Sequence, residues 1–211
     1  MSSLLVPTVL ENTPRGERAY DLFSRLLRDR IIVVNGPIDD TMSGLVVAQL
    51  LYLAAEDSKR EINMYINSPG GSINAGLGIY DTMRVLPCPI STTCVGYAAS
   101  FGTILLLAGE KGRRFSMPHA RIHLHQPLIS GSLSGQASDI DIHAREILHL
   151  RSEINDIIQE HSGQTLERIQ KDTNRDFYMS AVEAKEYGII DDILTYAEKK
   201  LPEPEEEPKN K

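Results

Sequence analysis

The fold is decided at Pro89-Ile-Ser-Thr-Thr-Cys-Val-Gly-Tyr-Ala-Ala-Ser-Phe-Gly102, where a strand pattern passes directly into a helix pattern. The β-branched run at 90–95 predicts a buried strand, and the apolar run at 99–109 predicts a buried helix. A strand that leads at once into a helix is the repeating unit of α/β proteins. The stretch therefore predicts one β-α unit, with the hydroxyl of Ser100 at its junction.

Two earlier stretches of the chain have the same pattern. A strand over Ile31–Val34 precedes a helix over Met42–Ala55, and a strand over Ile62–Ile66 precedes a helix over Ile73–Val85. Consecutive β-α units imply right-handed crossovers and a largely parallel sheet covered by helices. Ligand sites in such folds lie at the carboxyl ends of the strands, which is where we expect Ser100.

The remainder of the chain is expected to complete one domain over residues 16–199. From periodicity we predict an amphipathic helix at 16–28, strands at 113–116, 120–125 and near 193, and helices at 136–161, 165–172 and 180–187. The helix at 136–161, which Gly163 ends, would be roughly 39 Å long at 1.5 Å per residue. Part of it should project and bury its apolar stripe against a partner subunit. Residues 1–15 are expected to form an irregular arm, and residues 200–211 a disordered acidic tail.

Composition narrows the class of protein. The chain has 211 residues, a net charge of −7 and a pI near 5.4, which argues against binding nucleic acid or an anionic membrane through bulk charge. No stretch approaches the roughly 18 continuous apolar residues of a membrane span. The N-terminus is too short and too poor in positive charge for a secretory signal, so we expect a cytoplasmic protein.

Ser100 has the surroundings of a nucleophile. Its neighbours Gly96, Ala98, Ala99 and Gly102 are small enough for a substrate or another backbone to come close. A hydroxyl in the first turn of a helix lies beside unpaired N–H groups, which can stabilise an oxyanion. The alternative is a helix-capping serine without chemistry, a common arrangement.

A serine nucleophile needs a base, and we favour the histidines at 119, 123 and 125 over those at 143, 149 and 161 on the long helix, for which we expect a solvated surface role. His125 ends its strand at the rim where Ser100 should lie, and His123 shares its face one pleat back. The first three histidines also have zinc-ligand spacing, but no cysteine or carboxylate cluster near them supports a metal, and we predict none. Asp172, Asp176, Asp191 and Asp192 could each orient the base, and spacing does not choose among them.

Two adjacent glycines occur in the loop Asn67-Ser-Pro-Gly-Gly-Ser72. The loop lacks the spacing of a phosphate-binding or dinucleotide-binding motif. Glycine amides before a helix can instead bind an anion, so we interpret them as half of an oxyanion hole, with a plain tight turn as the alternative. Because Ala98 replaces the first glycine of Gly-x-Ser-x-Gly, the nucleophile elbow of an α/β-hydrolase is disfavoured.

Several motifs, in order, resemble those of the family of Clp protease proteolytic subunits (ClpP) from Leu5 to about Leu194. They are Val-Pro-Thr-Val with Arg-Gly-Glu-Arg, Ile-Asn-Ser-Pro-Gly-Gly-Ser, Gly-Tyr-Ala-Ala-Ser-Phe-Gly, His-Gln-Pro, Gly-Gln-Ala-Ser-Asp-Ile and Glu-Tyr-Gly-Ile-Ile-Asp. The resemblance implies that Ser100 is the nucleophile, His125 the general base and Asp176 the carboxylate that orients it. It also implies an oxyanion hole made by the backbone N–H groups of Gly71 and Phe101.

The resemblance further implies a crotonase-like α/β head with a protruding handle over about 128–162. Two stacked heptameric rings would enclose the active sites. The sequence does not tell whether each ring contains one gene product or several. A ring-shaped AAA+ ATPase would feed unfolded proteins through axial pores that the N-terminal arm lines. The chain itself would need no cofactor, because ATP is used by the ATPase. The strand at 128–133 would pair with substrate or with the opposite ring, and the residues before Leu5 could be a very short propeptide.

Two departures from the family pattern concern the contact between rings. The segment between Pro127 and Gly135 is longer by about two residues than is usual in the family. Asn174 replaces the acidic residue that commonly precedes Arg175, a residue that the resemblance assigns to a salt bridge between rings. We therefore expect a ring interface that differs in detail.

The leading hypothesis is an ATPase-dependent serine endopeptidase that degrades unfolded polypeptides to short peptides. The alternatives are a catalytically silent ring subunit, a non-catalytic binding ring, and a crotonase-like acyl-CoA enzyme, which would share the fold without needing the serine.

Overall fold

A parallel sheet forms the centre of the computed structural model, which describes residues 6–14, 16–128 and 135–196. Within those residues the sheet contains β3 (Ile31–Asn35), β4 (Ile62–Ser68), β5 (Ile90–Ala99), β6 (Arg114–Ser116), β7 (Arg121–Leu124), β8 (Phe177–Ser180) and β9 (Asp192–Ile193). Strands β3, β4, β5, β6 and β9 pair side by side in that order, and all of these pairs are parallel. The predicted α/β class with a largely parallel sheet is confirmed.

Strand β5 changes partners halfway along its length. Its first part pairs with β6 at Thr92–Cys94, whereas Tyr97–Ala99 pairs in parallel with β7, which in turn pairs antiparallel with β8. The register between β4 and β5 also shifts between Ile66 and Ser68. The last part of β5 and β7 therefore end together, and Ala99 lies opposite His123. This pairing brings the residues after both strands to one edge of the sheet.

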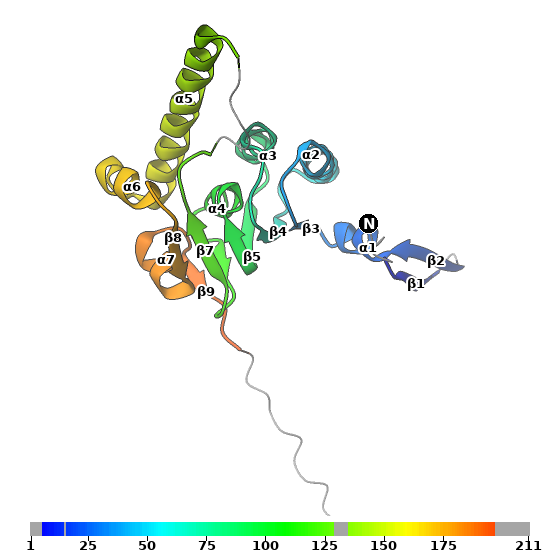
Figure 1. The fold of residues 1–211 in the computed structure, drawn as a ribbon. Coiled ribbons are helices and arrows are strands. Elements are labelled where there is room, and N and C mark those ends of the chain that lie inside the picture. The colour runs from blue at the N-terminus through cyan, green and yellow to red at the C-terminus, as the bar shows by residue number, and fades with distance from the viewer. Residues whose placement is uncertain (1–5, 15, 129–134, 197–211) are drawn as a thin grey trace, which may run out of the picture.

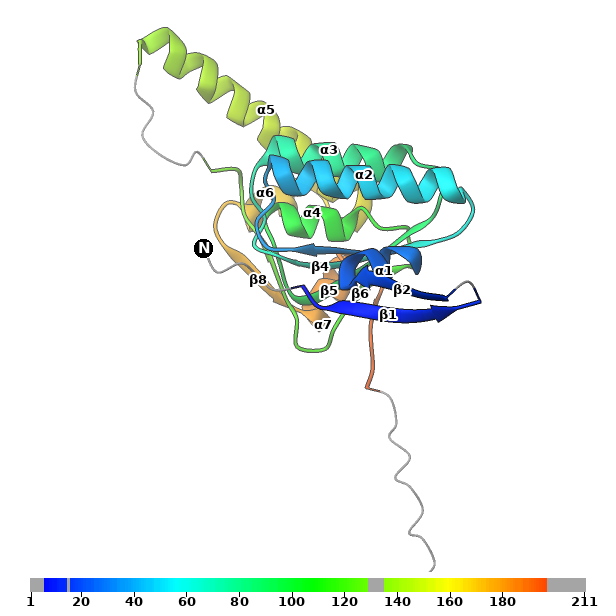
Figure 2. The ribbon, with the colours of Figure 1, turned by 90° about the vertical axis from the view of Figure 1, so that its right-hand side faces the viewer.

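Three helices lie together on one side of the sheet, as Figure 2 shows: α2 (Asp40–Glu56), α3 (Ile73–Val85) and α4 (Phe101–Leu107). The predicted bounds of α3 agree with the structure, and those of α2 agree within two residues. Every residue of α4 is buried, because this helix lies between the sheet and its neighbours. The central helix that follows Ser100 is thus held on all sides by the hydrophobic core.

Helix α5 (Ala137–Ser162) projects away from the head (Figure 1). Its 26 residues are followed by the capping residue Gly163, whose φ of 73° is the left-handed conformation that glycine adopts readily. Ile154 and Ile158 pack into the head, whereas the first half of the helix leaves Ile142 and Leu148 exposed. The prediction of a long helix that projects from the head is confirmed, and its burial against a partner subunit stays a prediction.

The shorter C-terminal elements complete the head. Helices α6 (Leu166–Thr173) and α7 (Ala181–Tyr187) match their predictions within one residue, and β9 lies where a last strand was expected. Strand β8 was not predicted, since four residues at the edge of the sheet carry little periodicity. Among the described residues, no helix combines the length and apolar character needed to cross a membrane.

The N-terminal prediction was wrong. Instead of an irregular arm followed by a helix over 16–28, strands β1 (Thr8–Thr13) and β2 (Gly16–Asp21) form an antiparallel hairpin, and α1 begins only at Leu22 (Leu22–Arg28). The helix starts there because the Asp21 carboxylate accepts a hydrogen bond from the amide of Ser24, at 3.0 Å. The hairpin crosses the boundary that we placed after residue 15.

Some predictions lie outside the described residues. They are the substrate or ring strand at 128–133, the lengthened segment between Pro127 and Gly135, the acidic tail at 200–211 and the propeptide before Leu5. These stay predictions.

Candidate active site

Ser100 lies in a strained turn between β5 and α4. Its φ of 52° and ψ of −125° are unusual for a residue with a side chain, and such a conformation costs about 1–3 kcal/mol. The Ser100 side chain makes no helix-capping hydrogen bond, so the interpretation as a simple capping serine is wrong. Although the Gly-x-Ser-x-Gly motif is absent, the sharp strand-to-helix turn presents the serine as a nucleophile elbow does.

Buried hydrogen bonds hold this turn in place. The amide of Ser100 donates to the carbonyl oxygen of His123, at 3.0 Å. The Thr103 hydroxyl lies 2.8 Å from the carbonyl oxygens of both Ala98 and His123, and thus ties α4 to the ends of β5 and β7. Because the Thr103 hydroxyl and the carbonyl oxygens beside it are buried, breaking the turn would leave polar atoms without partners, which maintains the strain.

The glycine loop after β4 packs directly against the serine turn. A Cβ atom at Gly70 would lie 2.6 Å from the Cβ of Ser100 and 2.9 Å from the amide nitrogen of Phe101, both closer than real Cβ atoms approach. One at Gly71 would lie 2.1 Å from the carbonyl oxygen of Ile38. Only glycine fits at these two positions, so the loop is built for close backbone approach to Ser100.

The same contact supports the predicted oxyanion hole. Phe101 is the first residue of α4, so its N–H has no acceptor within the helix. The Gly70 amide donates a hydrogen bond to the Ser68 hydroxyl, and the Ser72 amide donates one to the carbonyl oxygen of Ile38. Among the described residues, the Gly71 amide has no hydrogen-bond partner. The two amides that we expect to bind an oxyanion belong to segments in contact at Ser100.

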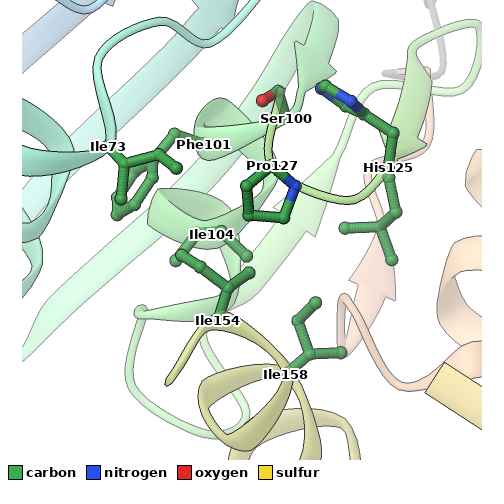
Figure 3. A pocket seen from close by; sticks show the side chains of 9 residues that line it. Ile73, Ser100, Phe101, Ile104, His125, Pro127, Ile154 and Ile158 are labelled. Carbon is green, nitrogen blue, oxygen red and sulfur yellow. The ribbon is translucent and has the colours of Figure 1, made fainter. Parts of the chain in front are cut away.

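An apolar pocket opens beside Ser100 (Figure 3). The pocket is partly open to solvent. Ser100 and His125 lie at its rim, and its walls are Ile73, Phe101, Ile104, Leu124, Pro127, Ile154 and Ile158. Ile154 and Ile158 come from the base of α5, more than fifty residues along the chain from Ser100, and sequence reasoning did not assign them to the site. The pocket suits an apolar side chain of a substrate.

His125 follows β7 and is half-buried at the rim of this pocket. Burial lowers the pKa of His125 below its ordinary value, and the neighbouring imidazole of His123 lowers it further, whereas Asp176 opposes them. A lowered pKa keeps the ring neutral near pH 7, as a general base requires. In Figure 3 the Ser100 hydroxyl is directed away from the ring, and the described structure contains no hydrogen bond between them. Such bonds are often absent until substrate binds.

Asp176 pairs with a different histidine from the one expected. Its Oδ1 lies 3.1 Å from Nε2 of His123, and the described residues show no hydrogen bond from Asp176 to His125. The rings of His123 and His125 are stacked, with centroids 5.1 Å apart and an interplanar angle of 15°. The carboxylate is therefore beside the predicted base, but it is engaged by the neighbouring imidazole.

The other candidate carboxylates are committed to cations elsewhere. Asp172 pairs with Arg168, Asp191 with Arg114 and Asp192 with Lys185. Asp176 is thus the member of the four that reaches a histidine. This choice depends on how β8 returns to β7, which the sequence pattern did not reveal.

The remaining histidines lie apart from the site. The ring of His119 lies against Tyr196, and the described residues contain no group of three side chains suited to hold a metal. His149 is exposed and pairs with Glu153, as predicted for a surface residue. The surface role predicted for His161 was wrong, because its ring is half-buried and lies 3.0 Å from the hydroxyl of Tyr80. His161 lies in the last turn of α5, where this helix joins the head.

Arg175 is exposed and forms no ion pair with any described residue of the chain. The backbone carbonyl oxygen of Asn174, where the family commonly has an acidic residue, accepts a hydrogen bond from the Gln126 side chain, at 2.9 Å. Since no described residue neutralises the guanidinium, a salt bridge from Arg175 to the opposite ring stays a prediction.

A comparison with known protein families matches residues 14–197 of the chain to the family described as Clp protease. The match covers the whole sheet, the handle helix and every candidate site residue named above.

Proposed function

The chain belongs to the Clp protease family and has its crotonase-like fold, and we propose that it is a serine endopeptidase in which Ser100 attacks the peptide bond. Membership of the family makes the protein a ClpP-type peptidase. The observation that carries the assignment of Ser100 is its strained backbone at the rim of the apolar pocket. Strain of this kind persists where surrounding structure maintains it, often at functional sites.

The catalytic cycle follows from the positions of the groups. His125 takes the proton of the Ser100 hydroxyl as its oxygen attacks the substrate carbonyl, and the amides of Gly71 and Phe101 stabilise the oxyanion. His125 then gives the proton to the leaving amine, which leaves an acyl group on Ser100. A water molecule then attacks that ester as His125 takes its proton, and His125 returns the proton to the Ser100 oxygen as the acyl group leaves as a carboxylic acid. Asp176 would stabilise the imidazolium form of His125 in both steps.

The apolar pocket predicts which substrates are cut fastest. Its walls offer branched and aromatic side chains, and the only ionisable group among its lining residues is the imidazole of His125 at the rim. A peptide that places an apolar side chain there buries it without leaving a polar partner unpaired. We therefore propose cleavage after apolar residues.

We also propose the assembly that the family resemblance implies: two stacked heptameric rings that enclose the sites and receive unfolded chains from an AAA+ ATPase. Members of the family form oligomers. The exposed Ile140, Ile142 and Leu148 on α5 support a subunit contact at the handle, because uncovered apolar side chains on a projecting helix need a partner. ATP would be used by the ATPase, and the peptidase chain itself would need no cofactor.

A fluorophosphonate probe tests the proposal. We expect it to label the purified protein at Ser100, and Ser100→Ala to abolish both labelling and cleavage of a fluorogenic peptide. Ser58→Ala, in an exposed loop after α2, is the matched control and should behave as the parent chain does. A protein that assembles but neither reacts with the probe nor cleaves peptides would instead be a silent subunit. Cleavage that survives Ser100→Ala would contradict the assignment of the nucleophile.

A further inference from the structure

His123 contacts all three members of the proposed catalytic group. Its backbone carbonyl oxygen accepts the hydrogen bond from the Ser100 amide, at 3.0 Å, and its Nε2 lies 3.1 Å from Oδ1 of Asp176. Its ring stacks on that of His125, with centroids 5.1 Å apart. The same ring also stacks on Tyr178 of β8, with centroids 4.4 Å apart. No other described residue has these contacts with Ser100, His125 and Asp176 together.

His123 and the Asp176 carboxylate that it binds differ in how freely their side chains can move. The His123 side chain is only 9% exposed and stacks on two rings, whereas the Asp176 side chain is 67% exposed. An exposed aspartate can change rotamer at little cost, but a stacked and buried imidazole cannot. Because the two imidazoles are stacked in nearly parallel planes, a carboxylate beside one ring needs only a short movement to reach the other.

We propose that His123 is a positioning residue that competes with His125 for the Asp176 carboxylate, so that His125 becomes fully effective as a base only when the carboxylate leaves His123. The inference rests on the proposed function, since it assigns a resting arrangement to that same site. In the resting arrangement the carboxylate is bound to His123 and the serine hydroxyl is not bound to His125. In the productive arrangement the carboxylate supports His125 and its imidazolium form in the transition state.

The charged groups around the pair support such a competition. Near the two imidazoles lie the Asp176 carboxylate and the Tyr178 phenol from the β8 side, and the Tyr97 phenol of β5 interacts with Tyr178 and Asp176. Burial raises the pKa of Tyr97, and its neighbour Tyr178 raises it further, so it carries no charge near neutral pH. Asp176 is then the anion for which both rings compete.

Two substitutions at position 123 separate competition from a merely structural role. His123→Phe keeps an aromatic ring between Tyr178 and His125 but removes the hydrogen bond to Asp176. His123→Gln keeps an N–H donor for the carboxylate but cannot take a positive charge. Assembly of each variant is checked by sedimentation, and both are studied as full-length assembled protein.

The first readout does not depend on peptidase activity. Diethyl pyrocarbonate modifies neutral imidazole, so its reaction with His125, followed by peptide mass spectrometry across pH, reports where His125 loses its proton. In His123→Phe we expect the midpoint to lie about one pH unit higher than in the parent chain, because the carboxylate then serves His125. In His123→Gln the midpoint should fall between the two. An unchanged or lower midpoint in His123→Phe would overturn the proposal.

The second readout is the pH profile of peptide cleavage. We expect the plateau kcat of His123→Phe to rise about three- to tenfold, since removal of the competitor increases the population of the productive arrangement, with a smaller rise for His123→Gln. A fall in kcat that Gln restores would show that the histidine only supports the structure and would reject the competition. If His123→Phe fails to assemble, the rise or fall of kcat in His123→Gln decides. A parent chain that cleaves nothing would refute the proposed function, and the midpoint of His125 modification would still test the inference.

Discussion

The two halves of the candidate site differ in how firmly the fold holds them. The half that contains Ser100 is closely packed, with Gly70 in contact with the serine turn and the buried Thr103 side chain tying it to both strands. The half that contains Asp176 is exposed, and its carboxylate pairs with His123 and not with the predicted base. Contacts within one chain thus fix the position of Ser100, whereas the Asp176 carboxylate that would support His125 can still move. We call the part around Ser100 the firm half and the part around Asp176 the adjustable half.

The largest effect is expected from Gly70→Ala, which disrupts the firm half. The new Cβ would meet the Ser100 Cβ at 2.6 Å and the carbonyl oxygen of Ala99 at 2.7 Å, so the turn must shift. Displacing the nucleophile and an oxyanion donor together should lower kcat/KM by about a thousandfold. The measurement is peptide cleavage by the assembled variant.

Gly112→Ala is the matched control for this substitution. Gly112 has a φ of 85°, against 86° at Gly70, but a Cβ there would meet nothing within 4 Å. It should cost a modest amount of stability and leave cleavage nearly unchanged. Equal losses of activity in the two variants would show that backbone conformation, and not contact with Ser100, explains the effect.

Thr103→Val removes a buried hydrogen bond that holds the Ser100 turn in place. The Thr103 side chain is fully buried, and removing its hydroxyl leaves carbonyl oxygens of β5 and β7 without that partner. The free energy of unfolding should fall by about 1–3 kcal/mol, measured by denaturant titration. Thr82→Val, which removes an exposed hydrogen bond to the carbonyl oxygen of Gly78, should cost less than about 0.5 kcal/mol. Comparable losses would mean that Thr103 does not anchor the turn.

Asp176→Asn tests the adjustable half, and we expect a smaller loss. Because the carboxylate is exposed and bound elsewhere in the resting arrangement, water screens its support of His125. We expect kcat to fall about tenfold, the factor that corresponds to about 1.4 kcal/mol of transition-state stabilisation. A loss as large as that of Gly70→Ala would show that both halves are equally fixed.

The smallest effect concerns the pH dependence of cleavage. Burial and the His123 ring lower the pKa of His125 below its ordinary value of 6.5. Since the neutral imidazole is the active base, kcat/KM should rise with pH through a midpoint below 6.5 and be near its plateau at neutral pH. A midpoint above 6.5 in the profile of the free enzyme would mean that a carboxylate already dominates at His125.

The sequence predicted most of the firm half because that half is local. Alternation of strand and helix patterns located the β-α units, and the small residues around Ser100 pointed to a site where a backbone must approach closely. The strained φ of Ser100 follows from contacts with His123 and Gly70, which no pattern within the strand reveals. The residue was therefore predictable, but its backbone conformation was not.

The adjustable half depends on contacts between distant segments. Four aspartates were equivalent by spacing, and only the pairing of β8 with β7 brings Asp176 to the histidines. The pocket wall from α5 arises in the same way, through Ile154 and Ile158. The N-terminal hairpin was missed because helical and strand periodicities overlap in short segments, and the Asp21 cap decides where the helix begins.

The most direct test of the central claim is mass spectrometry of the intact chain during turnover of a slowly hydrolysed ester with an apolar acyl group. The account predicts a transient increase in mass equal to that acyl group, located by peptide analysis on Ser100 and missing from Ser100→Ala. Turnover without a covalent intermediate, or an acyl group on another side chain, would contradict it.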